Sequence, residues 1–298
     1  MFKNVIIGVD EHEGGRDAVV LGRKLVDAEG VLTLVHVRPG DPHVWRGSSP
    51  AYEVVVRDDS QKLLEQVRNA TGVDARLKSV AAVSPGRGLH VMAEASGADL
   101  LVVGSSRRSL LGRVMVGDDT RAALNGASCA VAIAPAGYSH DGKPMRDIGV
   151  GYDGSPESRH AIEVGRQLAG QFGAKLLAFK AVSLPTYAFS GGYVAVNGDL
   201  INELVADARN SMADLGVDAQ AGYGFPEEEL ATWSALLDLL IVGSRGYGPL
   251  GRVVHGSTSL RLAKMARCPL LVLTRTADVE SSASMAESDQ GSSVVPVG

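Results

Sequence analysis

A glycine- and serine-rich segment after an apolar run has the residue types and spacing to bind an anion. It reads VGSRGYGPLGRVVHGST and carries Gly243, Gly246, Gly256 and Ser257. Glycines let a backbone curl so that several N–H groups point to one place. A Gly-Ser-Thr sequence that opens a helix adds the free N–H groups of the helix start. The spacing predicts two backbone anion sites at one strand end, as a polyphosphate requires. A plain glycine-rich connection with an ordinary helix cap is the alternative.

A similar segment, VGSSRRSLLGRVMVGDDT, stands in the first half of the chain. It carries Arg107 where the later segment has Gly246, and Asp118 where the later segment has Ser257. A carboxylate at a helix start can cap the free N–H groups itself, and it repels phosphate. The sequence therefore predicts that the first half has lost a triphosphate site.

The two segments belong to a repeat that spans the chain. NVIIGVD resembles DIGVGYDG, GADLLVVGS resembles LLDLLIVGS, and ASCAVAIAP resembles ARCPLLVLT. A period of about 140 residues indicates a duplicated domain. We predict domains at 1–136 and 147–276, joined by a polar segment with Gly and Pro. Residues 277–298 are rich in Ser and acidic residues without periodicity, which predicts a disordered tail.

Short continuous apolar runs alternate with segments of helical period in each half. This pattern is typical of an α/β fold with a parallel sheet covered on both faces, here two tandem doubly wound domains. In the second half we expect strands near 148–152, 175–182, 217–221, 238–243 and 269–274, and helices near 156–171, 198–213, 226–235 and 257–266. Ligands bind such folds at the carboxyl ends of the strands. The last strands, AVAIA and LLVLT, are expected to meet at an internal pseudo-two-fold interface, because a sheet edge needs cover.

Composition excludes several classes of protein. The 298 residues are 45% hydrophobic and 21% charged, with a net charge of −5. This balance indicates a globular protein whose partners are neither nucleic acid nor an anionic membrane. The sequence has no apolar run of about 18 residues, so no membrane span is expected. Cys129 and Cys268 each precede an apolar run, which predicts buried, reduced thiols at one repeated position and a cytoplasmic protein.

Three other segments resemble phosphate-binding loops superficially. GVGYDG, from Gly149 to Gly154, lacks the acidic residue that a dinucleotide fold needs after the next strand, and its first two glycines are expected inside a strand. GYSHDGKP has Pro144 where a P-loop needs Ser or Thr. SGGY, at 190–193, is interpreted as a flexible loop.

A resemblance to a known family follows from these motifs. First strands ending in GVD and GYDGS, and DLLIVGSRGYGPLGRVVHGSTS ahead of CPLLVL, resemble the universal stress protein family over residues 3–135 and 147–275. The resemblance implies a flavodoxin- or Rossmann-like α/β fold in tandem. In ATP-binding members, the motif G-x2-G-x9-G-[S/T] holds the phosphates. The second half matches this motif at every defined position.

The resemblance also implies which residues bind the nucleotide. Asp153, at the end of the first strand of the second half, would face the ribose and adenine, and the backbone near Ala181 would contact the adenine edge. The site residues implied in this way are Gly151, Tyr152, Asp153, Ala181, Val242, Gly243, Ser244, Arg245, Gly246, Gly256, Ser257 and Thr258.

No catalytic set stands out in the sequence. The seven histidines form neither an H-x-G-H nor an H-E-x-x-H signature. We therefore expect a non-enzymatic stress-response or signalling module that binds ATP, with or without magnesium, and acts on a protein partner. A slow ATPase, a nucleotidyl transferase and a nucleotide-free scaffold are the alternatives. The two halves are expected to form an intrachain pseudo-dimer, and whether two chains also pair is left open.

Overall fold

The computed structural model describes residues 2–40, 50–105, 113–114, 122–124, 126–183, 198–244 and 257–273. The described elements of the first half are β1 (Phe2–Gly8), α1 (Glu13–Leu25), β2 (Val26–Pro39), α2 (Pro50–Thr71), β3 (Arg76–Ala82), α3 (Pro85–Ser96), β4 (Leu100–Gly104) and β5 (Ala130–Ala134). A short helix, α5 (Tyr138–Asp141), lies in the segment between the halves.

The second half repeats this order. Its described elements are β6 (Asp147–Gly151), α6 (Pro156–Phe172), β7 (Lys175–Val182), α7 (Gly198–Asn210), η2 (Ala213–Leu215), β8 (Asp218–Tyr223), α8 (Pro226–Trp233), η3 (Ser234–Leu236), β9 (Leu239–Gly243), α9 (Ser257–Met265) and β10 (Leu270–Leu273). The strands and helices expected from the sequence are present, and most of their ends lie within two or three residues of the expected positions. The tail and the SGGY segment lie outside the described residues.

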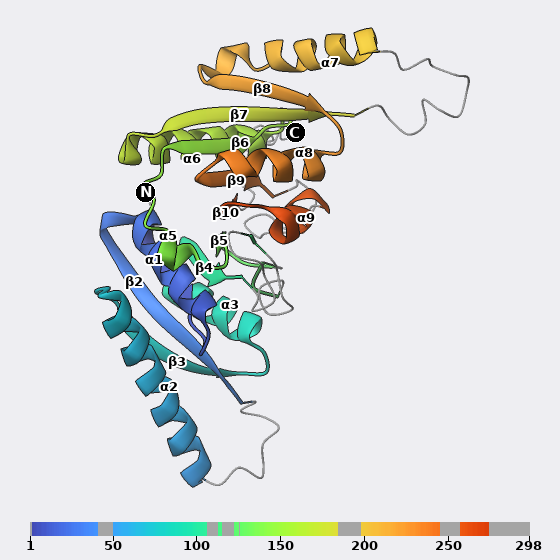
Figure 1. The fold of residues 1–298 in the computed structure, drawn as a ribbon. Helices are drawn as coiled ribbons and strands as arrows, with labels where there is room; N and C mark the ends of the chain where they lie inside the picture. The colour runs from blue at the N-terminus through green and yellow to red at the C-terminus, as the bar shows by residue number, and fades with distance from the viewer. Residues whose placement is uncertain are drawn as a thin grey trace, which may run out of the picture.

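All the described strands form one sheet, in the order β3-β2-β1-β4-β5-β10-β9-β6-β7-β8. Neighbouring strands are parallel except at the centre, where β5 and β10 run antiparallel and Ala132 pairs with Leu271. The expected meeting of the two last strands is confirmed. Figure 1 shows the first half, in blue to green, and the second half, in yellow to red, on either side of this joint.

The sheet has an apolar core on each face, and both cores run through the two halves. Val5 and Ile7 of β1 lie in the core beneath α1, α2 and α6, whereas Ile6 lies in the core beneath α3, α8 and α9. Side chains of a strand alternate between faces, so a strand of continuous apolar residues must be covered on both sides. This is the doubly wound α/β fold that the sequence predicts.

The duplication extends to single hydrogen bonds. The carboxylate of Asp99, just before β4, accepts hydrogen bonds from the backbone N–H groups of Lys3 and Asn4 at 2.7 and 3.1 Å. Asp238, just before β9, accepts from Arg146 and Asp147 at 2.7 and 3.0 Å. The same residue type thus fastens the start of the first strand in each half.

The segment between the halves is fastened to α1. Asp17 is 1% exposed, and its carboxylate accepts hydrogen bonds from the backbone N–H groups of Gly137 and Ser139 at 2.8 and 2.7 Å. The Lys24 ammonium donates to the Tyr138 hydroxyl at 3.1 Å and lies 4.7 Å from the centre of its ring. These contacts bind the start of α5 to the first half.

Both cysteines are buried free thiols, as the sequence predicts. Burial raises the pKa of the Cys129 thiol to about 12 and raises the pKa of Cys268 further. Within the described part of the chain, no helix has both the length and the apolar character that a membrane crossing requires.

Candidate functional site

A cavity of about 620 Å³ opens at the carboxyl ends of β6, β7 and β9 in the second half. The starts of α6, α8 and α9 surround it, as in other open α/β sheets, where ligands bind beyond the strand ends. Its described lining residues are Gly151, Tyr152, Asp153, Ser155, Glu157, Ser158, Phe179, Ala181, Pro226, Leu230, Val242, Gly243, Ser244, Thr258 and Ser259.

Most of the predicted site residues come together here. Gly151, Tyr152, Asp153, Ala181, Val242, Gly243, Ser244 and Thr258 all line the cavity. Ser257 is the first residue of α9. Arg245, Gly246 and Gly256 lie outside the described residues, so their predicted roles stay predictions.

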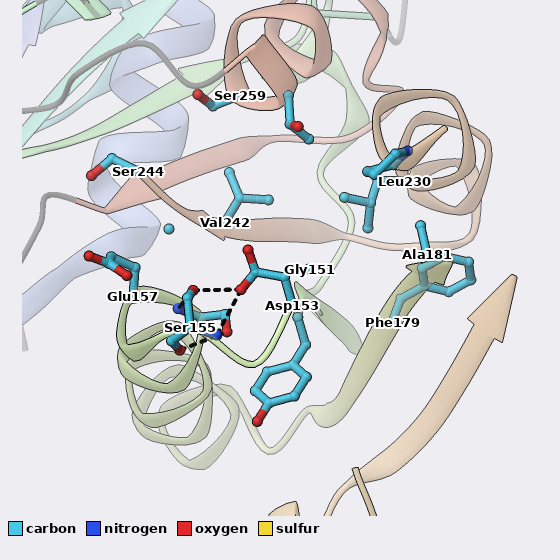
Figure 2. Close-up of a pocket in the computed structure, with 15 residues that line it drawn as sticks. Gly151, Asp153, Ser155, Glu157, Phe179, Ala181, Leu230, Val242, Ser244 and Ser259 are labelled. Atoms are coloured by element: carbon cyan, nitrogen blue, oxygen red, sulfur yellow. Dashed lines mark hydrogen bonds between the residues drawn. The ribbon is translucent and has the colours of Figure 1, made fainter. Parts of the chain in front are cut away.

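Asp153 is held in a fixed position between the two ends of the cavity (Figure 2). Its Oδ1 accepts hydrogen bonds from the Ser155 backbone N–H at 3.0 Å and from the Ser155 hydroxyl at 2.5 Å. Burial acts to raise the pKa of Asp153, but the hydrogen bonds from Ser155 and Ser158 together lower it below its ordinary value. The site therefore presents an ionised carboxylate, an acceptor for the hydroxyl groups of a ligand.

One end of the cavity is apolar. Figure 2 shows Phe179, Ala181 and Leu230 grouped on the same side of Asp153. Phe179 packs against Trp233 with 5.1 Å between the ring centres, and both rings are buried. A Cβ atom at Gly149 would lie 2.5 Å from the Trp233 ring, so glycine in β6 allows the indole to support Phe179. This end suits a flat, largely apolar group such as a nucleobase.

The opposite end is lined by hydroxyl groups and one carboxylate. Ser155, Glu157 and Ser244 lie there in Figure 2, and Thr258 and Ser259 at the start of α9 complete the lining. Ser244 is 1% exposed, and its hydroxyl has no hydrogen-bond partner among the described residues. A buried hydroxyl without a partner is costly, and the Ser244 hydroxyl lines the cavity, where it is available to bond another group.

The glycine at 243 also has a packing role. A Cβ atom there would lie 2.8 Å from the Glu157 Cβ and 3.0 Å from the Glu157 backbone carbonyl. The glycine lets the start of α6 approach the end of β9 closely. Among the described residues around the cavity, Gly154 has a positive φ of 88°, in the turn between β6 and α6.

The sequence did not reveal every lining residue. Those it missed are Ser155, Glu157, Ser158, Phe179, Pro226, Leu230 and Ser259. One signal was available for Phe179, because side chains two residues apart on a strand share a face and Ala181 was already implied. A second signal was available for Ser155 and Ser158, because an N-cap serine is recognisable in a sequence. The Ser155 side chain caps α6 and accepts a hydrogen bond from the Ser158 backbone N–H. Among the described residues, no three His, Cys, Asp or Glu side chains gather as a metal site.

Comparison with known proteins identifies the family of this chain. The model of the universal stress protein family matches residues 1–135 and again residues 145–274. The chain belongs to the universal stress protein family. The two matches make it a tandem member, with one domain of the family in each half.

Individual relatives agree with this assignment. A universal stress protein of Mycobacterium tuberculosis is 28% identical over 284 residues, which cover 90% of this chain and 96% of the relative. A universal stress protein of Thermus aquaticus is 29% identical over 135 residues, 43% of this chain and 98% of the relative. The crystal structure of a universal stress protein from Archaeoglobus fulgidus covers 91% of this chain and 98% of its own, at 15% identity and a TM-score of 0.64, and so shares the fold.

Proposed function

We propose that this universal stress protein binds one ATP per chain in the second-half cavity and acts as a nucleotide-dependent stress-response or signalling module. The observation that carries the proposal is the polarity of the cavity. An apolar end, a fixed carboxylate and a buried hydroxyl without a partner follow one another from β7 to the start of α9. A nucleotide has the same sequence of chemical groups.

In this proposal each part of the nucleotide has its own part of the lining. Adenine lies against Phe179 and Leu230, with its edge toward the backbone of Ala181. Asp153 accepts hydrogen bonds from the ribose hydroxyls. The phosphates extend toward Ser244 and the start of α9, where free backbone N–H groups and the helix dipole favour negative charge.

Gly246, Gly256 and Ser257 complete the phosphate site in this proposal. Their spacing matches the motif of ATP-binding family members, and they connect two elements that line the cavity, β9 and α9. The proposed function is binding without rapid hydrolysis, since none of the described lining residues is assigned to activate water. A change of affinity for a protein partner on nucleotide binding would then transmit the signal.

Calorimetric titration with ATP tests the proposal. We expect about one site per chain, and no measurable binding by Gly246→Val, because a branched side chain would occupy the phosphate loop. Gly170→Ala is the control, since Gly170 lies in α6 with open space around it, and it should bind as the parent does. Equal binding by Gly246→Val and the parent would refute the assigned phosphate site.

Two further measurements identify the ligand and its fate. Mass spectrometry of small molecules that copurify with the native protein should detect an adenine nucleotide. Release of ADP should stay far below one per bound ATP over hours. Steady release of ADP would instead make the protein an ATPase.

A further inference from the structure

The helices α8 and α9 form two facing walls of the cavity. Pro226 and Leu230 of α8 face it from one side, and Thr258 and Ser259 of α9 from the other. The space for a nucleotide therefore depends on how far apart these two helix starts are held.

An ion pair joins the two helices beside the cavity. Arg261 Nη1 of α9 contacts Glu227 Oε1 of α8. The Glu227 side chain is 10% exposed and that of Arg261 is 62% exposed. Neither residue belongs to the described cavity lining, although each lies within one helical turn of residues that do. The pair acts between the helices, away from the ligand space.

A second contact fastens the same helices at their other ends. The backbone N–H of Arg267, after α9, donates to the Ser234 hydroxyl at 2.9 Å, and that hydroxyl donates to Ala231 O of α8 at 2.7 Å. A short hydrogen-bond chain thus holds this end of the two helices, and the long side chains of Glu227 and Arg261 meet between them nearer the cavity.

The first half has two small residues at the corresponding place. Gly86 follows Pro85 at the start of α3 as Glu227 follows Pro226, and Ala122 corresponds to Arg261 in the repeat. A Cβ atom at Gly86 would lie 2.5 Å from the Ala122 Cβ and 2.8 Å from its carbonyl carbon. His90 Nε2 lies 2.7 Å from Ala123 O and ties the same two segments together. Here the two segments touch almost backbone to backbone.

We infer that the Glu227–Arg261 ion pair is a spacer that sets the distance between α8 and α9 and so keeps the second-half cavity wide enough for the nucleoside part of its ligand. The inference rests on the proposed function. Both residues are positioning residues, since they act through the helices and not on the ligand. Among the described residues of the first half, the direct contact of Gly86 with Ala122 takes the place of such a pair.

The chemistry of the pair explains why it resists closure. Glu227 is nearly buried, and moving the helices together would force its carboxylate out of contact with Arg261 or into apolar surroundings. Truncating both side chains removes this resistance and gives α8 and α9 the small residues that permit close approach in the first half.

Calorimetry with two ligands, ATP and adenosine, tests the inference. The first variant carries Glu227→Gly with Arg261→Ala, which copies the first half. The second carries Glu227→Arg with Arg261→Glu, which keeps the length and attraction of the pair but reverses its charges. Glu228→Ala, an exposed acid on the same helix, is the matched control.

We expect the first variant to lose about tenfold or more in affinity for both ligands. The reversed pair should bind both within about threefold of the parent, and the control should be unchanged. Adenosine carries no phosphate, so its parallel loss distinguishes spacing from attraction between Arg261 and phosphate. Circular dichroism and a melting curve establish that each variant is folded, and if the first variant is not, the reversed pair decides alone.

Two results would overturn the spacer. In one, the folded first variant binds both ligands like the parent. In the other, the reversed pair keeps adenosine but loses ATP, which would assign Arg261 an electrostatic role. If the parent itself bound neither ligand, the proposed function would fall and this inference with it, so the two failures are distinguishable.

Discussion

The two halves share a scaffold but differ at the residues that a ligand would touch. In each half an aspartate after the first strand accepts a backbone hydrogen bond at 3.0 Å, from His12 to Asp10 and from Ser155 to Asp153. In each half the serine after the fourth strand bonds through its N–H to the last strand, at 3.0 Å for Ser105 and 2.9 Å for Ser244. The backbone geometry at these two strand ends is thus the same in both halves.

The side chains differ in a consistent direction. Gly8 pairs with Val35 across the first half, whereas Gly151 pairs with Phe179 across the second. The Ser105 hydroxyl donates to Ala134 O at 2.7 Å, while that of Ser244 has no partner among the described residues. At this position the first half satisfies its serine hydroxyl internally, whereas in the second half the hydroxyl has no partner among the described residues. The fold can therefore stay the same while these side chains change, since the register of the sheet does not depend on them.

The largest expected effect is a gain of binding by the first half. We predict that Arg107→Gly with Asp118→Ser, in a chain whose second site is disabled by Gly246→Val, acquires ATP binding. A carboxylate at about 4 Å from a phosphate charge costs about 4 kcal/mol at an effective dielectric constant of 20, or about a thousandfold in affinity.

Calorimetry on the double variant and on each single variant checks this prediction. Only the double variant should bind, and more weakly than the natural second site, because the Gly86–Ala122 contact remains. Tight ATP binding by the unmodified first half would contradict the idea that its site was lost.

An intermediate effect concerns a feature that only one half has. Asp17→Ala removes the acceptor of two partly buried N–H groups, so we expect the free energy of unfolding to fall by about 3 kcal/mol. Glu163→Ala is the comparison, on α6, the helix that corresponds to α1. It removes an exposed ion pair with Arg166 and should change the free energy of unfolding by less than about 0.5 kcal/mol. Urea denaturation measures both, and equal losses would show that the Asp17 bonds do not fasten the linker.

The smallest effect comes from two equivalent serines with opposite consequences. Ser105→Ala should lower the free energy of unfolding by about 1 kcal/mol, because it removes a hydrogen bond to Ala134. Ser244→Ala should leave the ligand-free stability unchanged or slightly raised, because its hydroxyl bonds to no described residue. Ser244→Ala should instead weaken ATP binding by about 1.5 to 3 kcal/mol.

Thermal melting with and without ATP separates the two serines. A matching loss of stability in both ligand-free variants would mean that the Ser244 hydroxyl has an internal partner and awaits no ligand.

Sequence patterns predicted the strands, the duplication and the central pairing of β5 with β10, because apolar runs and repeats are local signals. The family resemblance implied Asp153, Ala181 and Ser244, and these residues line one cavity. Phe179 and Leu230 escaped prediction because their role depends on register between strands and on the angle of α8. Gly243 was predicted for its conformational freedom, and the structure adds a packing reason that spacing could not show, the close approach of Glu157. Spacing along the sequence does not reveal the distance in space between elements that are far apart in the chain.

The antiparallel pairing of β5 with β10 has a consequence for how the two halves can evolve. When two identical chains build such a sheet, every substitution appears at both sites at once. Here one continuous chain supplies both sides of the joint, so each half can change while its neighbour stays the same. The two halves also cannot dissociate on dilution, because they belong to one chain. Every molecule therefore contains one copy of each half. Arg107 and Asp118 in one half, beside Gly246 and Ser257 in the other, are the difference that such a covalent joint permits.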